Sequence, residues 1–255
     1  MGSQQISLTV VPGLPLIETG DDLALIISEA IRRAGLTLLD GDVVVITSKI
    51  VSKAEGRWID LDTVEPDAEA EDIAAQCGKD PREVAVILGE SEGVSRVRQG
   101  VLVVRHRLGF VCANAGMDHS NVRPGGAWRL LLPCDPDQSA RELRARLSET
   151  FGAQVGVIIS DSHGRPFRLG TVGAAIGAAG LPALWDWRGR PDLFGERLQA
   201  TEVGFADEIA AAAGLALGQA GEGTPVVIVR GLDYPVDESA QASDLIRPRE
   251  LDLYA

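Results

Sequence analysis

Apolar runs of strand length recur along the chain and alternate with polar segments. The run DVVVIT at 42–47 is apolar almost throughout, which is typical of a strand in a sheet that is covered on both faces. Similar runs predict further strands, at residues 6–11, 84–88, 101–104, 155–160 and 225–231. The pattern therefore predicts at least one buried sheet.

Other segments carry apolar residues at helical spacing. One of them predicts a helix that Thr19 caps and Gly35 ends. Two more helices are expected at residues 139–150 and at about 204–219. The segment 170–181 is rich in small residues and predicts either a tightly packed helix or a loop.

The spacing of two predicted strands bears on the fold class. Residues 84–88 and 101–104 are too close for a crossover helix, so we expect antiparallel pairing somewhere in the fold. We find no repeat and no linker, and 255 residues with 45% hydrophobic content suffice for one large domain or two small lobes. The fold class predicted from the residues is mixed α and β.

Composition excludes several classes of protein. No apolar run approaches the roughly 18 residues of a membrane span. A net charge of −13 disfavours a nucleic-acid partner, which would need a basic face. The three cysteines form no C-x-x-C pair and suggest neither a disulfide framework nor a thiolate metal site, so we expect a cytoplasmic location.

Lysine is scarce in this chain. Of 24 basic residues, only Lys49, Lys53 and Lys79 are lysines, and the first two stand four apart just after the strand at 42–47. If Thr47 or Ser48 caps a helix there, both ammonium groups share one face near its start, which suits a phosphate. A solvated lysine face explains the spacing equally well, and scarcity of lysine elsewhere favours the phosphate modestly.

Any nucleotide site in this chain must be of an uncommon kind. No G-x-x-x-x-G-K-[ST] is present, and no G-x-G-x-x-G follows a strand, so the sequence has neither a P-loop nor a Rossmann fingerprint.

Two polar clusters interrupt apolar surroundings. Asp118 and Asn121 lie in DHSN, and Asp161 and Ser162 follow the strand at 155–160. Both clusters have an ordinary explanation as turns. Their carboxylate, hydroxyl and amide oxygens also suit a hard cation such as Mg²⁺, with Asp118 and Asp161 as partners across the fold.

Histidines and arginines add little that is specific. His119 and His163 each lie near an aspartate, but three histidines without H-x-x-x-H spacing make zinc a weak interpretation. Arg165 and Arg168 are available for anionic oxygens. The residues alone thus indicate no more than a metal–nucleotide enzyme.

Seven motifs follow one another in order over nearly the whole chain. They are GLPLI (13–17), TSKIVSKAEGR (47–57), NAGMDHSNV (114–122), SDSHGRPFRLG (160–170), DWRGRPDLFGERL (186–198), ADEIAAAAGLALGQA (206–220) and PVVIVRG (225–231). Together they resemble the coenzyme F420 γ-glutamyl ligase family. The resemblance is to the stand-alone ligase rather than to the form fused to a nitroreductase-like domain. It implies one ligase domain over residues 1–255, with an α+β fold of mixed sheets and flanking helices in two lobes that form an intertwined homodimer.

The resemblance also implies a reaction in coenzyme F420 biosynthesis. GTP phosphorylates the lactyl carboxylate of coenzyme F420-0, or of a dehydro precursor, and the amine of L-glutamate attacks the acyl phosphate. The products are an amide, GDP and phosphate. The cofactors implied are two divalent cations, Mg²⁺ or Mn²⁺, with K⁺ as an optional further ion. A carboxylate is a poor electrophile until phosphorylated, and divalent cations screen the triphosphate as it approaches.

Residue roles follow from the resemblance where the motifs match. Nucleotide contacts are implied for Gly13, Leu14, Pro15, Leu16, Ser48, Lys49, Lys53 and Asn121. Metal ligands are implied for Asp118, Asp161, Ser162 and Gln219. Catalysis is expected to depend on Asp118, Asp161 and Lys53.

Two other functions remain as alternatives. A metal-dependent nucleotide phosphohydrolase would use the same aspartates, and phosphate release without precursor or glutamate would distinguish it. A nucleotide-binding regulatory protein without turnover has less need of two metal-ligating carboxylates, so Asp118 and Asp161 weigh against it.

Overall fold

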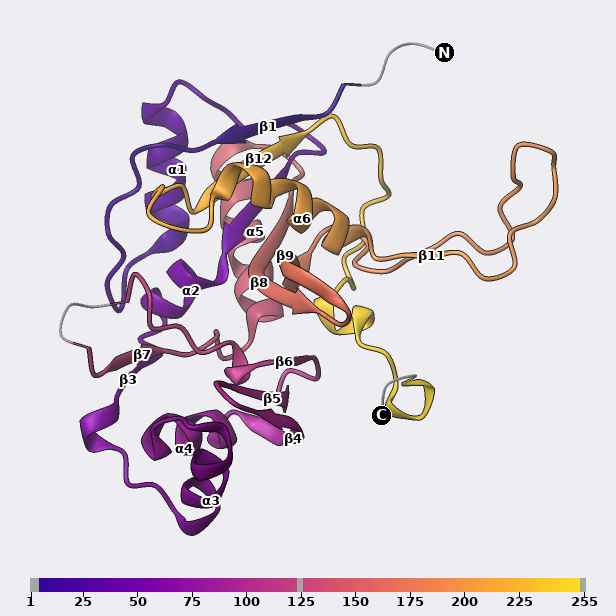
Figure 1. The fold of residues 1–255 in the computed structure, drawn as a ribbon. Helices are drawn as coiled ribbons and strands as arrows, with labels where there is room; N and C mark the ends of the chain where they lie inside the picture. The colour runs from indigo at the N-terminus through magenta and orange to yellow at the C-terminus, as the bar shows by residue number, and fades with distance from the viewer. Residues whose placement is uncertain (1–4, 123–125, 253–255) are drawn as a thin grey trace.

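Five strands form the central sheet, in the order β1–β12–β2–β8–β9 (Figure 1). The structure is a computed structural model that describes residues 5–122 and 126–252. Within this sheet β2 and β8 run parallel, while the other neighbours are antiparallel. The strands are β1 (Ser7–Val10), β12 (Val226–Arg230), β2 (Val43–Thr47), β8 (Gly156–Arg165) and β9 (Arg168–Ala179). Four of the predicted strands are thereby confirmed.

Helices cover both faces of the sheet, as the apolar runs predicted. They are α1 (Leu23–Arg33), α5 (Pro136–Phe151) and α6 (Phe205–Leu217). Successive side chains of a strand point to opposite faces. Val44 and Ile46 of β2 accordingly join the core with α1 and α5, and Val43 and Val45 join the core with α6. All four are fully buried, which explains why β2 is apolar throughout.

The prediction of a strand at 84–88 is wrong, because these residues lie in helix α4 (Pro81–Gly89). Asp80 caps this helix by accepting a hydrogen bond from the backbone N–H of Arg82, and Pro81 occupies its first turn. A short apolar run fits a buried strand or a buried helix, and here the residues before the run decide. Antiparallel pairing is confirmed nearby, but between β4 (Ser91–Arg98) and β5 (Val101–His106).

Both interpretations of 170–181 are also wrong, because β9 runs through this segment. Its small residues let helices approach the sheet closely. A Cβ on Gly173 would come within 2.3 Å of the Ala210 carbonyl oxygen on α6, and one on Gly177 within 2.3 Å of the Pro136 carbonyl oxygen on α5. Small size here reflects packing on both faces of a strand rather than a helix.

The cap of α1 is a third correction. Asp22, not Thr19, is the capping residue, and its carboxylate accepts from the backbone N–H of Leu25. The helix ends before Gly35 as expected, with Gly35 at a φ of +69°. The hydroxyl of Thr19 instead accepts a hydrogen bond from the indole of Trp58.

A smaller unit with its own apolar core lies beside the main sheet (Figure 1). Its elements are α3 (Ala68–Cys77), α4, β4, β5 and β6 (Val111–Ala113). Val84 and Ile87 of α4 join Leu102 and Val104 of β5 in this core, and all four are fully buried.

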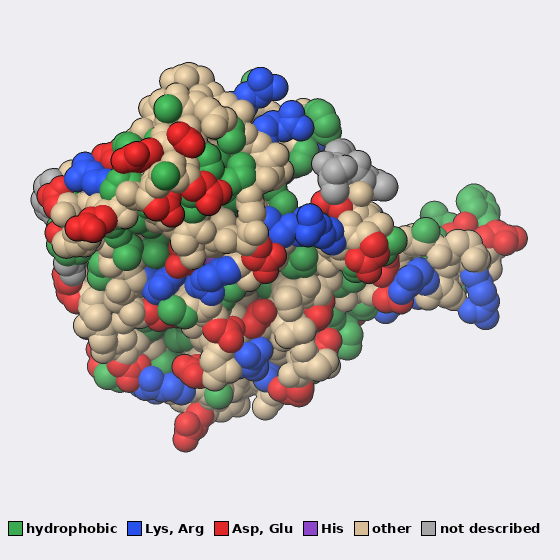
Figure 2. Space-filling view, turned by 90° about the horizontal axis from the view of Figure 1, so that it is seen from below, with side chains coloured by type: hydrophobic (Ala, Val, Ile, Leu, Met, Phe, Trp, Pro, Cys, Tyr) green, Lys and Arg blue, Asp and Glu red, His purple; other side chains and the backbone are tan. Residues whose placement is uncertain are grey.

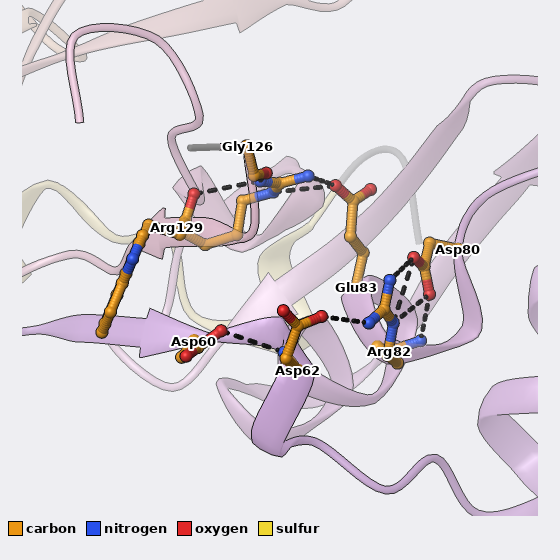
Figure 3. Close-up of polar contacts among 8 residues, drawn as sticks. Asp60, Asp62, Asp80, Arg82, Glu83, Gly126 and Arg129 are labelled. Carbon is orange, nitrogen blue, oxygen red and sulfur yellow. Dashed lines mark hydrogen bonds and ion pairs between the residues drawn. The ribbon is translucent and has the colours of Figure 1, made fainter. Parts of the chain in front are cut away.

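Charged side chains tie this unit to a short ribbon formed by two strands, β3 (Trp58–Asp60) and β7 (Trp128–Leu130). Figure 3 shows Arg129 of β7 donating to Glu83 of α4, with Nε 2.8 Å from Oε1. Beside it, Arg82 bridges Asp80 and Asp62, at 2.7 and 2.8 Å. The ribbon and the smaller unit are thus held together through the start of α4.

An arm projects from the body between β10 (Trp185–Asp186) and β11 (Glu202–Val203) (Figures 1 and 2). Leu193 and Phe194 on this arm are 98% and 91% exposed. The two-lobed, intertwined dimer remains a prediction. Among the described residues, no helix has the length and apolar character needed to cross a membrane.

Candidate active site

A cleft of about 930 Å³ collects nearly all of the predicted site residues. It lies where the loop at 14–18, the start of the helix after β2, the loop at 116–122, the middle of β8 and the loop after α6 meet. The predicted residues that line it are Leu14, Pro15, Leu16, Ser48, Lys49, Lys53, Asp118, Asn121, Asp161, Ser162 and Gln219. These side chains come from segments spread over more than 200 residues of sequence, and the fold alone unites them.

Asp161 is positioned by the register of two parallel strands. Thr47, the last residue of β2, pairs with Ser160 of β8. The residues that follow them, Ser48 and Asp161, therefore reach the cleft side by side. Ser48 Oγ donates to Asp161 Oδ1 at 2.8 Å. Because β8 continues to Arg165, Asp161 and Ser162 lie within a strand and not in the turn that the sequence also allowed.

The Asp161 carboxylate is largely shielded from solvent. Its side chain is 13% exposed, and His163 Nε2 lies 3.1 Å from Oδ2. Burial raises the pKa of a carboxyl group, but His163 and the Ser48 hydroxyl outweigh this effect and hold the pKa of Asp161 below its usual range. The carboxylate is therefore ionised at neutral pH.

Asp118 reaches the cleft from the loop at 116–122. Its backbone N–H and C=O pair with Leu130 of β7, at 2.9 and 3.0 Å, which fixes the loop against the ribbon. Lys49 Nζ lies 3.3 Å from Asp118 Oδ2. Burial raises the pKa of Asp118, Lys49 counteracts this, and the negative charge of Asp161 adds to the rise. The two carboxylates are thus close enough to repel each other.

The other two predicted metal ligands contact each other. Ser162 Oγ donates to Gln219 Oε1 at 2.9 Å, which joins β8 to the loop after α6. Asn121 joins the same loop, because its Nδ2 donates to the Ala220 carbonyl oxygen at 2.8 Å. The loop at 116–122 and the loop after α6 therefore adjoin each other in the lining of one site.

The donor set fits a hard divalent cation. Asp118, Asp161, Ser162 and Gln219 all offer oxygen, the ligand that Mg²⁺ and Mn²⁺ prefer. A cation between the two carboxylates would also relieve the repulsion by Asp161 that adds to the raised pKa of Asp118. Among the described residues, no three His, Cys, Asp or Glu side chains are arranged to hold a metal ion, so such side chains alone do not complete a cation site. Two carboxylates completed by phosphate oxygens and water are a common Mg²⁺ arrangement.

The lysine pair lies on helix α2 (Ser48–Ala54), which begins where the sequence predicted. Thr47 holds the capping position, although its side chain makes no capping hydrogen bond. Lys49 and Lys53 both line the cleft, so they share the face that the spacing implied. Lys49 also donates to the Ser120 carbonyl oxygen at 3.2 Å. The pair is not a solvated helix face remote from the other site residues.

Three residues lie away from the cleft lining. Gly13 precedes the lining loop, and its carbonyl oxygen accepts a hydrogen bond from Arg33. Arg165 and Arg168 flank the turn between β8 and β9, and Arg165 donates to the Leu169 carbonyl oxygen. Within one described chain, neither arginine reaches the place where an anionic substrate would meet Asp161.

The structure adds cleft residues that sequence reasoning missed. Trp58 and Glu18 line the cleft beside Lys53. So does the loop GQAGEGT at 218–224, of which only Gln219 was singled out. Three glycines within six residues after a helix were a signal for a ligand-binding loop. No such signal marked Trp58 in the sequence, because a single aromatic residue in a short strand is typical of a core position.

Comparison with known proteins identifies the family of the chain. Residues 13–231 match the family described as F420-0:Gamma-glutamyl ligase. The chain is 51% identical over 252 residues to the coenzyme F420:L-glutamate ligase of Methanothermobacter thermautotrophicus, covering 98% of both proteins. It is 47% identical over 256 residues to the enzyme of that name from Methanopyrus kandleri, covering 99% of both. Such similarity over nearly the full length shows that the chain belongs to the F420-0:gamma-glutamyl ligase family.

Proposed function

We propose that this protein is a GTP-dependent ligase that joins L-glutamate to the lactyl carboxylate of coenzyme F420-0, or of a dehydro precursor, through an amide bond. Membership of the family supports the proposal, as do the relatives named coenzyme F420:L-glutamate ligase.

The proposed reaction has two steps. An oxygen of the lactyl carboxylate attacks the γ-phosphorus of GTP, the bond to the β-phosphate oxygen breaks, and GDP leaves. The free amine of L-glutamate then attacks the carbonyl carbon of the acyl phosphate. The C–O bond to phosphate breaks, inorganic phosphate leaves, and the nitrogen loses one proton to give the amide. Phosphorylation is required because a free carboxylate has no adequate leaving group.

The charge at the site suits the first step. A carboxylate and a triphosphate repel each other, so the site must concentrate positive charge where they meet. Lys49 and Lys53 provide two ammonium groups on one wall of the cleft. Asp118, Asp161, Ser162 and Gln219 would hold Mg²⁺ or Mn²⁺, which when bound would neutralise charge on the phosphates.

The cleft also excludes some water from that region. Asp161 is 13% exposed and Ser48 only 3%, so the carboxylate oxygens lie at the bottom of the cleft rather than at its rim. Charges act more strongly in such a setting than in bulk water. The same shielding would protect an acyl phosphate from hydrolysis until the amine of L-glutamate arrives.

The observation that carries the proposal is that Asp118, Asp161 and the lysine pair line one cleft. Mass spectrometry of the product formed from coenzyme F420-0, GTP, Mg²⁺ and L-glutamate tests it. We expect a product heavier by one or more glutamyl residues, with GDP released in proportion. Phosphate release that needs neither coenzyme F420-0 nor L-glutamate would show a phosphohydrolase instead.

A further inference from the structure

The two ends of the cleft differ in chemistry. Asp118, Asp161 and the oxygen donors beside them lie at one end. Apolar and aromatic side chains of the lining, among them Leu14, Leu16 and Trp58, come from the loop at 14–18 and from β3. Leu16 is 87% exposed although it lines the cleft, so this wall offers apolar surface that the protein itself does not cover.

Helix α2 connects the two ends. At its start, Ser48 contacts Asp161 and Lys49 contacts Asp118. Lys53 follows four residues later, about 6 Å along the helix axis. Its ammonium lies 5.9 Å from the centre of the Trp58 ring. Carboxylates, two lysines and then an indole therefore follow one another along a single wall.

The Trp58 ring is held in place from two sides. Its indole N–H donates to Thr19 Oγ1 at 3.1 Å, and its backbone lies in β3, where it pairs with Leu130 of β7. The loop carrying Thr19 is itself fixed to α2, because the Gly20 N–H donates to the Ala54 carbonyl oxygen at 2.8 Å. A ring fixed in this way loses little rotational freedom when a flat ligand stacks on it.

We propose that Trp58 is the stacking platform for the nucleobase of the nucleotide. This inference rests on the proposed function, since it takes the phosphates to lie along Lys49 and Lys53. With the terminal phosphate near Asp118 and Asp161, the chain of phosphates extends along α2 toward Trp58 and delivers the base there. Stacking on an indole is worth about 1–3 kcal/mol per base and accepts any base, because every base has a π face. Trp58 therefore supplies affinity rather than a choice among purines.

The order of carboxylates, lysines and indole along α2 also places the acceptor away from Trp58. The carboxylate that is phosphorylated must meet the terminal phosphate at the carboxylate end of the cleft. Because the base occupies the Trp58 face, the acceptor reaches the terminal phosphate without contact with the indole. Removal of the indole should weaken nucleotide binding and leave acceptor binding unchanged.

Calorimetric titration tests this with GDP and Mg²⁺, with inorganic tripolyphosphate and Mg²⁺, and with coenzyme F420-0. For Trp58→Leu we expect GDP to bind about 5- to 150-fold more weakly, and the other two ligands to bind as to the wild type. Trp58→Phe keeps an aromatic face and should retain most of the affinity. Trp187→Phe makes the same substitution on the arm between β10 and β11, outside the cleft lining, and should bind GDP like the wild type.

Tryptophan fluorescence gives a second readout of the same variants. GDP should quench the wild type and Trp187→Phe alike, and Trp58→Phe should lose this quenching. Equal GDP affinity of Trp58→Leu and wild type would overturn the inference while leaving the proposed function intact. So would equal weakening of tripolyphosphate, or weakening of coenzyme F420-0 alone. A wild type that binds no GDP would instead overturn the proposed function, and the inference with it.

Discussion

Ser48 Oγ donates to Asp161 Oδ1 at 2.8 Å, and this bond joins the first residue of α2 to the middle of β8. The other carboxylate oxygen lies 3.1 Å from His163 Nε2. Both oxygens of Asp161 are therefore positioned before any cation arrives. In metal sites such supporting contacts orient the ligand and tune its affinity. Ser48, for which the family resemblance implied a nucleotide contact, thus also acts on the carboxylate.

Ser48→Ala should weaken Mn²⁺ binding. Ser48 is 3% exposed, so water has little access to replace its hydroxyl as a donor to Asp161. Loss of a supporting contact of this kind typically lowers metal affinity about 10- to 100-fold. Electron paramagnetic resonance of free Mn²⁺ during titration measures the affinity without any turnover.

Ser52→Ala is the matched control for this variant. Ser52 lies on the same helix and is 1% exposed, but it does not line the cleft. Its Mn²⁺ affinity should equal that of the wild type. If both serine variants lost affinity equally, the effect would come from a disturbed helix rather than from the contact with Asp161.

Asp118→Asn and Asp161→Asn should each lower turnover by orders of magnitude with the fold intact. An amide donates less charge than a carboxylate to a hard cation, at the point where phosphoryl charge must be neutralised. Ser162→Ala should be milder, since water can replace a neutral hydroxyl. Initial rates measured against Mg²⁺ concentration check this, and near wild-type turnover of either aspartate variant at limiting Mg²⁺ would exclude these residues as metal ligands.

Lys49→Met and Lys53→Met should each weaken GDP binding roughly 10- to 150-fold. A charge-assisted contact to phosphate is worth about 1.5–3 kcal/mol, and each 1.4 kcal/mol is a factor of ten. Methionine keeps the alkyl stem, so packing should change little. Binding of L-glutamate should barely change in either variant. Calorimetry with GDP and Mg²⁺ measures the effect.

Lys79→Met is the internal control for the lysine pair. Lys79 lies between α3 and α4 in the smaller unit and does not line the cleft. This variant should bind GDP like the wild type. Equal affinities for all three lysine variants would show that the spacing of Lys49 and Lys53 has no role in phosphate binding.

Sequence patterns correctly predicted the elements that are equally buried along their whole length. β2 is buried on both faces, so its apolar run admits one interpretation. The apolar run at 84–88 fits either a strand or a helix. It forms helix α4, which Asp80 caps and which packs in the core of the smaller unit. β9 was not predicted, because its glycines are required by the close packing of α5 and α6 against the strand, and these helices lie elsewhere in the sequence. Long-range packing determines the secondary structure of such segments, and a local sequence pattern carries no information about that packing.

The residues of the candidate site could be proposed from the sequence, but their geometry could not. Motifs indicated Asp118 and Asp161 as partners, and the cleft brings them together. The contact of Ser48 with Asp161 depends on the parallel register of β2 and β8, which no local pattern reveals. Trp58 was missed because the role proposed for it depends on its position beside Lys53, and the turn between α2 and β3 sets that position.

Glu90 should stabilise the protein at neutral pH and lose this effect in acid. Its carboxylate, 14% exposed, accepts from Arg57 at 2.7 Å and from Arg107 at 3.0 Å. Burial alone would raise the pKa of Glu90, but His106 and the two arginines lower it to about 2. Since the folded pKa lies below the unfolded value of about 4.3, the stabilisation is complete above that value and fades as the pH falls toward 2.

Glu90→Gln should therefore lower the free energy of unfolding by about 2–3 kcal/mol at pH 7. The difference from the wild type should shrink as the pH falls below about 4.5, because protonated Glu90 and glutamine are both neutral. Urea denaturation at several pH values measures it. A difference that stays constant down to pH 3 would mean that the shape of Glu90, and not its charge, stabilises the protein.

The last prediction concerns assembly and the arm between β10 and β11. Leu193 and Phe194 are almost fully exposed on it, and soluble monomers rarely present large apolar side chains together in this way. We expect the protein to be a homodimer in which the arm contacts the partner copy. Replacement of both residues with serine should shift sedimentation velocity from dimer to monomer. Leu25→Ser, at a 50% exposed position on α1 at the opposite end of the molecule, should remain dimeric (Figure 1). A wild type that sediments as a fully active monomer would refute the dimer, and a doubly substituted arm that still dimerises would assign the interface to another surface.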